Sequence, residues 1–121
     1  MSRFTAYLHP KCSTCAEARA WLAAHKIAYA EKDLRTAAPT IAELRAMLKA
    51  QGGERKKLLN TSGLEYRKQG LAARLPGLGD DDALAILNTN GMLVKRPFLI
   101  GPGVGLVGFN EQVWAQALAA S

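Results

Sequence analysis

Residues 4–34 read FTAYLHPKCSTCAEARAWLAAHKIAYAEKDL, and the pattern in this stretch decides the fold. The short apolar segment from Phe4 to Leu8 ends at His-Pro, which predicts a strand. The Ala-rich segment from Ser13 to about His25 predicts a helix, because Ala has the highest helix propensity. The segment from Ile27 to Leu34 follows a short turn and predicts a second strand. The three together predict a βαβ unit with parallel strands and a right-handed crossover.

The region from about residue 40 to 90 has the pattern of several helices. Thr40 and Glu43 have the spacing of a capping box and begin a helix with one apolar face, which ends at Gly52-Gly53. Asn60-Thr61-Ser62-Gly63 is typical of a loop. Further short helices are expected at Leu58-Leu59, from Leu71 to Leu75, and from Asp80 to Leu87.

The C-terminal part of the chain predicts two strands and a helix. We expect one strand from Met92 to Ile100, with Arg96-Pro97 inside it, and another from Val104 to Val107, joined as a hairpin by Gly-Pro-Gly. A final helix from Glu111 to about Ala119 follows, with Asn110 as its cap. The order is βαβ, a helical insert at about residues 40–90, and ββα, which is an α/β fold.

Length and composition predict a single domain, residues 1–121. The chain is 49% hydrophobic and 21% charged, which is enough apolar material for a core without a disulfide or a metal. We see no signal peptide and no membrane-spanning stretch, so we expect a cytoplasmic protein with reduced thiols. The net charge of +6 allows anionic partners, but the basic residues are scattered and lack interleaved aromatics. We therefore expect no direct binding to nucleic acid.

The two cysteines, Cys12 and Cys15, lie where the first strand gives way to the first helix. A helix N-terminus offers free N–H groups and a partial positive charge, which favour the thiolate of Cys12, and Lys11 adds a cation. Ser13 or Thr14 can cap the helix. Cys15 is one helical turn from Cys12 and can attack a disulfide formed there. This spacing predicts a nucleophile and a resolving thiol.

Two other interpretations of the cysteine pair are open. They can be ordinary cysteines that happen to be close in sequence. They can also bind zinc together with His9, but His25 is the other good candidate ligand and is expected at the far end of the helix. We predict no metal site.

Arg96-Pro97 is the second notable feature of the sequence. A proline inside a strand removes a ladder donor, so it usually has a positional reason, such as a cis peptide bond. Arg96 can offer a fixed cation to the thiolate or to an anionic substrate. The alternative is a surface arginine on an edge strand.

The chain resembles the arsenate-reductase-like family (ArsC), and within it the branch that includes the Spx and MgsR regulators. The resemblance lies in residues 10–15, 59–67, 82–97 and 106–109, and so covers nearly the whole chain. It implies a thioredoxin-like fold with a helical insert. It also implies that Cys12 is the reactive cysteine, that Pro97 is a cis-proline facing it, and that Arg96 lies beside the thiol.

The chain departs from the glutaredoxin-coupled arsenate reductases of this family. Those enzymes carry two further arginines for the oxyanion, at the positions held here by Asn60 and Gly108. They also usually lack a second cysteine at the position of Cys15. One arginine makes a different site from three convergent ones. We expect Lys11, Ser13, Thr14, Asn60 and Pro97 to support or bind substrate around Cys12, Cys15 and Arg96.

These observations predict a thiol–disulfide oxidoreductase with Cys12 as nucleophile and Cys15 as resolving thiol. It would act on a small disulfide or an anionic substrate, hold no bound cofactor, and be reduced again by glutathione or by a thioredoxin- or glutaredoxin-type protein. The resemblance implies an alternative, a redox-sensing transcriptional regulator that binds the RNA polymerase α subunit. Arsenate reduction is the third hypothesis.

Overall fold

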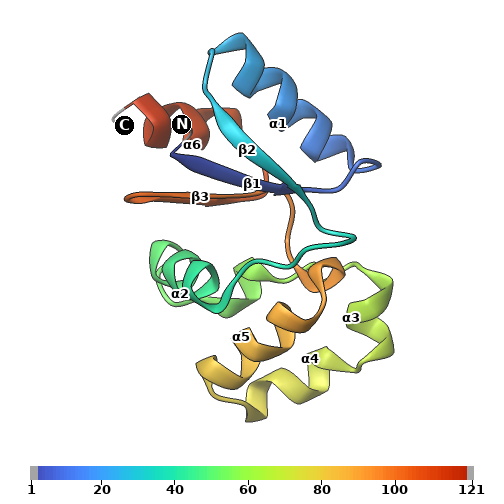
Figure 1. Ribbon diagram of the computed structural model, residues 1–121. Coiled ribbons are helices and arrows are strands. Elements are labelled where there is room, and N and C mark those ends of the chain that lie inside the picture. The colour runs from blue at the N-terminus through green and yellow to red at the C-terminus, as the bar shows by residue number, and fades with distance from the viewer. Residues whose placement is uncertain (1–2, 120–121) are drawn as a thin grey trace.

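The computed structural model describes residues 3–119, so the two ends of the expected domain, residues 1–2 and 120–121, lie outside it. A mixed four-stranded sheet with strand order β2-β1-β3-β4 forms its middle layer (Figure 1). Strands β1 and β2 pair in parallel, and the pairs β1–β3 and β3–β4 are antiparallel. The predicted α/β class is confirmed. The strands are β1 (Phe4–Leu8), β2 (Tyr29–Asp33), β3 (Phe98–Gly101) and β4 (Val104–Val107).

Helices cover both faces of the sheet. The helices α1 (Ser13–Ala24) and α6 (Glu111–Ala119) lie on one face, and the helical insert lies on the other (Figure 1). The insert contains α2 (Ile41–Ala50), α3 (Leu64–Lys68), α4 (Leu71–Arg74) and α5 (Asp80–Thr89), together with the 3₁₀ helices η1 (Arg55–Leu58), η2 (Leu75–Gly77) and η3 (Gly91–Leu93).

Each face of the sheet has its own apolar core. Phe4, Ala6 and Leu8 of β1 pack with α1 and α6, whereas Tyr7 packs with the leucines of the insert. Successive side chains of a strand point to opposite faces, and here both faces are covered. The apolar pattern of residues 4–8 follows from this burial on both sides.

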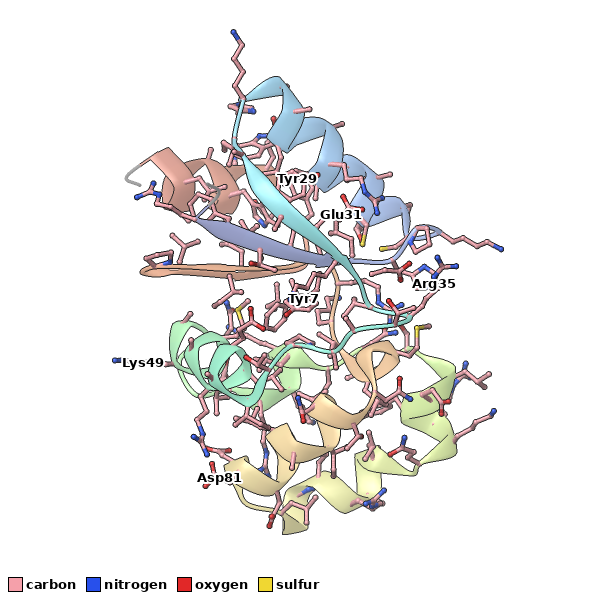
Figure 2. The ribbon with its side chains drawn as sticks, in the orientation of Figure 1. Tyr7, Tyr29, Glu31, Arg35, Lys49 and Asp81 are labelled. Atoms are coloured by element: carbon pink, nitrogen blue, oxygen red, sulfur yellow. The ribbon has the colours of Figure 1, made fainter. Side chains whose placement is uncertain are left out.

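Tyr7 connects the sheet to the insert. Its hydroxyl donates a hydrogen bond of 2.6 Å to a carboxylate oxygen of Glu43 in α2 (Figure 2 shows Tyr7 on the insert side of the sheet). The same carboxylate accepts the backbone N–H of Thr40, whose hydroxyl accepts the N–H of Glu43. The predicted capping box is therefore present, and Glu43 also holds α2 against the sheet.

Several other expectations are confirmed. Gly52 ends α2 with a φ of +71°, the Arg96–Pro97 peptide bond is cis, and Asn110 accepts the N–H of Val113 in α6. The β3–β4 hairpin forms as expected.

The prediction of a strand from Met92 to Ile100 is wrong for the first half of that range. Residues 91–93 form η3, because the Asn90 side chain accepts the N–H of Met92 at 2.9 Å and turns the chain. Val94 makes only an isolated bridge with Leu59, and β3 begins at Phe98, after the cis-proline. Leu93 and Val94 are buried in the core of the insert, not in the sheet. The helix α3 was also not expected from the sequence.

Candidate functional site

Cys12 is the N-cap residue of α1. Its backbone is extended (φ −95°, ψ 121°), and its sulfur accepts the backbone N–H of Cys15 at 3.3 Å. The sulfur also lies 3.0 Å from the hydroxyl oxygen of Thr14. The expectation that Ser13 or Thr14 caps the helix is wrong, because the chain is already helical at Ser13 and the Cys12 sulfur takes the place of the capping oxygen.

The environments of the two thiols shift their pKa values in opposite directions. Burial alone would raise the pKa of Cys12, but hydrogen bonds from the Thr14 hydroxyl, the Cys15 thiol and the backbone N–H groups of both residues outweigh it and lower this pKa. Burial raises the pKa of Cys15 to about 12, and its hydrogen bond to Cys12 adds to the increase. Cys12 is therefore the more acidic thiol of the pair, and Cys15 holds its proton more tightly.

The two thiols also differ in access to solvent. Cys12 is half-buried, whereas Cys15 has 0% exposure and packs in the core between α1, α6 and the sheet. Both are free thiols. A molecule in solution can therefore reach the Cys12 sulfur but not the Cys15 sulfur.

Cys12 lies in a surface hollow of about 450 Å³, which we call the thiol hollow. Five of the predicted site residues meet there, namely Lys11, Cys12, Thr14, Asn60 and Arg96. Ser13 is exposed outside it, and Cys15 and Pro97 are buried and do not line it. The sequence analysis missed four further lining residues: His9, Ser62, Met92 and Lys95.

Arg96 is held by the loop that precedes β3. Its Nη2 donates to the carbonyl of Met92 at 2.8 Å. Its Nε is buried and has no hydrogen-bond partner among residues 3–119. Arg96 lines the hollow and forms no ion pair within residues 3–119, so the charge of its guanidinium is available to an anionic group there.

His9 faces the same hollow as a neutral imidazole. Its Nδ1 accepts the backbone N–H of Lys11 at 3.0 Å, so the proton of the neutral ring is on Nε2. Burial lowers the pKa of His9, and the charges of Arg96 and Arg35 lower it further. The position of His9 three residues before Cys12 was a signal that it lies near the thiol, whereas Ser62, Met92 and Lys95 come from the distant insert and its C-terminal loop.

Asn60 and Gly108 hold positions where the resemblance implied arginines in arsenate reductases. Asn60 lines the hollow, and its side-chain amide donates to the carbonyl of Met92 at 3.5 Å. Gly108 has a φ of +69°, and a Cβ there would lie 3.4 Å from Cε of Lys95. Among the described residues, Arg96 is the arginine that lines the thiol hollow.

Two other kinds of site are absent from residues 3–119. No group of three or more histidine, cysteine, aspartate or glutamate side chains is arranged to hold a metal ion. None of the helices in this part of the chain has the length and apolar character needed to cross a bilayer.

Comparison with known proteins relates this arrangement to one family. The chain is 37% identical over 107 residues to the uncharacterized protein YusI of Bacillus subtilis, covering 88% of this chain and 91% of YusI. It is 33% identical over 107 residues to the global transcriptional regulator Spx of Enterococcus faecalis, covering 88% of this chain and 80% of Spx. A crystal structure of a putative ArsC family related protein from Bacteroides fragilis superposes with a TM-score of 0.88 at 36% identity, covering 95% of this chain and 97% of the other.

That structural neighbour supports the thioredoxin-like arrangement expected from the sequence. The sequence model of the ArsC family matches residues 7–117 of this chain. This range includes both cysteines, the helical insert and the cis-proline. The chain therefore belongs to the ArsC family.

Proposed function

We propose that the protein is a thiol–disulfide oxidoreductase in which Cys12 is the nucleophile and Cys15 the resolving thiol. The observation that carries the proposal is the opposite shift of the two thiol pKa values at the start of α1. A nucleophilic thiol needs a thiolate at neutral pH, and a resolving thiol must stay protonated until the mixed disulfide exists.

The reaction follows from this difference. The Cys12 thiolate attacks one sulfur of a substrate disulfide, the substrate S–S bond breaks, and the other half leaves as a thiolate. Cys15 then attacks the Cys12 sulfur, and its proton passes to the substrate sulfur that leaves. The second half of the substrate is released as a thiol, and a Cys12–Cys15 disulfide remains, so two electrons have passed to the substrate.

The hydrogen bonds that stabilise the Cys12 thiolate weaken once its charge is lost in the mixed disulfide. The Cys15 thiol then no longer donates to a negative sulfur, so one cause of its raised pKa disappears. Glutathione or a thioredoxin- or glutaredoxin-type protein would restore the dithiol. Arg96 and the Nε2–H of neutral His9 would contact an anionic or polar part of the substrate in the thiol hollow.

The test is a single turnover of the reduced protein with a small disulfide, followed by mass spectrometry. We expect wild type to lose two hydrogens as the Cys12–Cys15 disulfide forms. Cys15→Ser should stop at a mixed disulfide on Cys12, and Cys12→Ser should react at least about a thousandfold more slowly. Equal reactivity of Cys12→Ser and wild type would contradict the proposal.

A second candidate function is a redox-sensing transcriptional regulator that binds the RNA polymerase α subunit. It is favoured by the named relatives, since the Spx protein of Enterococcus faecalis is 33% identical to this chain over 107 residues. Affinity chromatography with purified α subunit, under reducing and oxidising conditions, separates the two functions. A complex whose affinity changes with the Cys12–Cys15 bond, together with no catalytic turnover, would favour the regulator.

Arsenate reduction has less support from the site. Asn60 and Gly108 cannot supply guanidinium groups, so Arg96 would be the one guanidinium for the oxyanion among the described residues of the hollow, beside the ammonium groups of Lys11 and Lys95. Arsenate-dependent oxidation of Cys12, absent in Cys12→Ser, would revive this function.

A further inference from the structure

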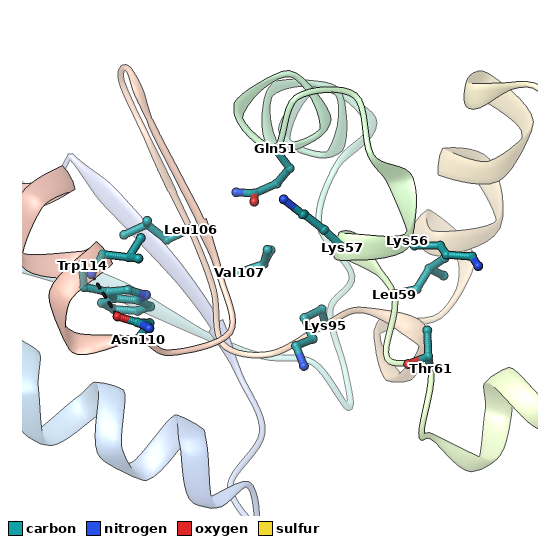
Figure 3. A pocket seen from close by; sticks show the side chains of 11 residues that line it. Gln51, Lys56, Lys57, Leu59, Thr61, Lys95, Leu106, Val107, Asn110 and Trp114 are labelled. Atoms are coloured by element: carbon teal, nitrogen blue, oxygen red, sulfur yellow. Dashed lines mark hydrogen bonds between the residues drawn. The ribbon is translucent and has the colours of Figure 1, made fainter.

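A second hollow, of about 490 Å³, lies beside the thiol hollow. Its cations are Lys56, Lys57 and Lys95, and its other wall is formed by β4 and the start of α6, with Val113 and Trp114 among the lining residues. Figure 3 shows Lys57 and Lys95 extending into the space between the two walls, with Lys56 at the outer edge and pointing away. We call it the lysine hollow. Its volume lies in the range of about 300–1,000 Å³ that is usual for ligand sites.

The segment from Leu59 to Ser62 lies between the two hollows and lines both of them. Along the segment from Leu59 to Ser62, the side chains alternate between them: Leu59 and Thr61 line the lysine hollow, whereas Asn60 and Ser62 line the thiol hollow. Lys95 lines both hollows. A ligand whose disulfide reaches Cys12 can therefore continue over this segment and place its next residues in the lysine hollow.

The charge of the lysine hollow selects an acidic ligand. Neither Asp nor Glu is among the side chains that line it. Lys57 pairs with Glu54 at 2.9 Å, but both side chains are more than half exposed, so an incoming carboxylate can replace Glu54 at little cost. Within residues 3–119, Lys56 and Lys95 form no ion pair.

The uncharged wall favours a peptide over an inorganic anion or a nucleic acid. Val113 is 50% exposed and offers an apolar contact that an oxyanion cannot use. Trp114 is only 1% exposed, and its indole N–H donates to the carbonyl of Gly108, so it presents no face on which a base could stack. A short peptide with carboxylates and an apolar side chain matches both walls.

We propose that the lysine hollow binds an acidic segment of the peptide or protein whose disulfide Cys12 reduces. This inference rests on the proposed oxidoreductase function and adds the class of its substrate. The chemistry is unchanged: Cys12 forms a bond to the substrate cysteine, the substrate disulfide breaks, and Cys15 releases the acidic peptide as a thiol. Carboxylate–ammonium pairs in the lysine hollow would hold the segment during both steps.

The test uses two synthetic peptides of equal length, each with one cysteine as a 2-pyridyl disulfide. One carries three glutamates and a valine beside the cysteine, and the other carries glutamines in place of the glutamates. Release of 2-thiopyridone by excess reduced protein gives a second-order rate constant for each peptide without any external reductant. Mass spectrometry of the same samples detects the Cys12–Cys15 disulfide.

We expect wild type to prefer the acidic peptide by roughly tenfold, since each exposed ion pair contributes about 1.5- to 5-fold. In the Lys56→Gln/Lys57→Gln variant this preference should fall to about twofold or less. The Lys49→Gln/Lys68→Gln variant loses the same charge outside the lysine hollow and should keep it. The preference should also weaken as salt is raised.

The possible failures are distinguishable. Equal rates for both peptides, or a preference that Lys56→Gln/Lys57→Gln leaves intact, would overturn the acidic-substrate inference while the Cys12–Cys15 disulfide still forms. No such disulfide with either peptide would overturn the oxidoreductase function itself. A single-stranded RNA that blocks the acidic peptide at lower concentration than a glutamate peptide without cysteine would reassign the hollow to nucleic acid.

Discussion

The two faces of the sheet contribute to the thiol hollow in different ways. On the face covered by α1 and α6, a single regular helix positions Cys12, and the hydrogen bonds that lower the pKa of its thiol come from Thr14 and Cys15. On the other face, the helical insert places no reactive thiol. It supplies loops, residues 59–62 and 91–96, whose side chains close the hollow around the sulfur.

This comparison separates reactivity from shape. The acidity of Cys12 depends on contacts within four residues of chain, so it should survive damage to the insert. The shape of the hollow depends on residues far from Cys12 in sequence that line it together with Cys12, such as Asn60 and Arg96. Four substitutions test this separation.

The largest effect is expected from Leu84→Ala in the core of the insert. Leu84 is 1% exposed, and removal of a buried leucine side chain typically costs about 2–5 kcal/mol in the free energy of unfolding. Urea denaturation measures this loss, and Leu64→Ala, at a residue 62% exposed, should stay within about 0.5 kcal/mol of wild type. The pH dependence of Cys12 alkylation should be unchanged in the folded Leu84→Ala protein. A shifted alkylation profile would mean that the acidity of Cys12 depends on the insert after all.

Gly91→Ala tests the point where the insert packs on the segment that follows β2. A Cβ on Gly91 would collide with the backbone carbonyl of Leu34, so we expect a loss of about 1–3 kcal/mol in the free energy of unfolding. The loop after Gly91 carries Met92, Lys95 and Arg96, so disulfide reduction should also slow, with little change in Cys12 alkylation. Gly77→Ala is the control, since a Cβ there meets no atom within 4 Å.

Thr14→Val tests whether contacts within the first turn of α1 set the acidity of Cys12. It removes the hydroxyl that lies 3.0 Å from the Cys12 sulfur and keeps the shape of the side chain. The pKa of Cys12 should rise toward its ordinary value, and alkylation by iodoacetamide at neutral pH should slow by roughly threefold to tenfold. Thr14→Ser keeps the hydroxyl and should behave like wild type. An unchanged rate in Thr14→Val would mean that the other hydrogen bonds stabilise the thiolate alone.

The smallest effect is expected at Asp33, where the chain leaves the sheet for the insert. The side chain and backbone N–H of Arg35 lower the pKa of Asp33 to about 2. Because the folded pKa is below the ordinary value of 3.8, this contribution is fully present above about pH 4 and is lost as the pH falls through about 2. Urea denaturation between these pH values should show a shallower acid loss for Asp33→Asn than for wild type. Parallel curves would contradict this.

Much of the fold was predictable from local signals. The strand from Phe4 to Leu8 has the predicted bounds, and the capping box at Thr40 forms as its spacing indicates. These features depend on residues close in sequence, for which turn and cap chemistry is decisive. The segment from Met92 to Val94 was misassigned because its apolar residues fit a strand equally well, and only packing against the insert decides where they are buried.

The candidate site also contains residues that local sequence predicted and residues that it did not. The spacing of Cys12 and Cys15 at a strand-to-helix junction was enough to predict a nucleophile and a resolving thiol, although Cys12 itself, and not Ser13 or Thr14, caps the helix. Ser62, Met92 and Lys95 were not predictable, because they have no pattern of their own and reach the hollow only through the path of the insert.

The sequence by itself determined the order of the strands and of the longer helices, and the helix that begins at the thiol pair. These properties arise from backbone preferences and hydrogen bonds over a few residues. Tertiary structure alone decided that Cys15 is buried while Cys12 is accessible, and that Lys95 joins two hollows. Burial and shape depend on which distant side chains exclude water from a given atom, and no short stretch of sequence contains that information.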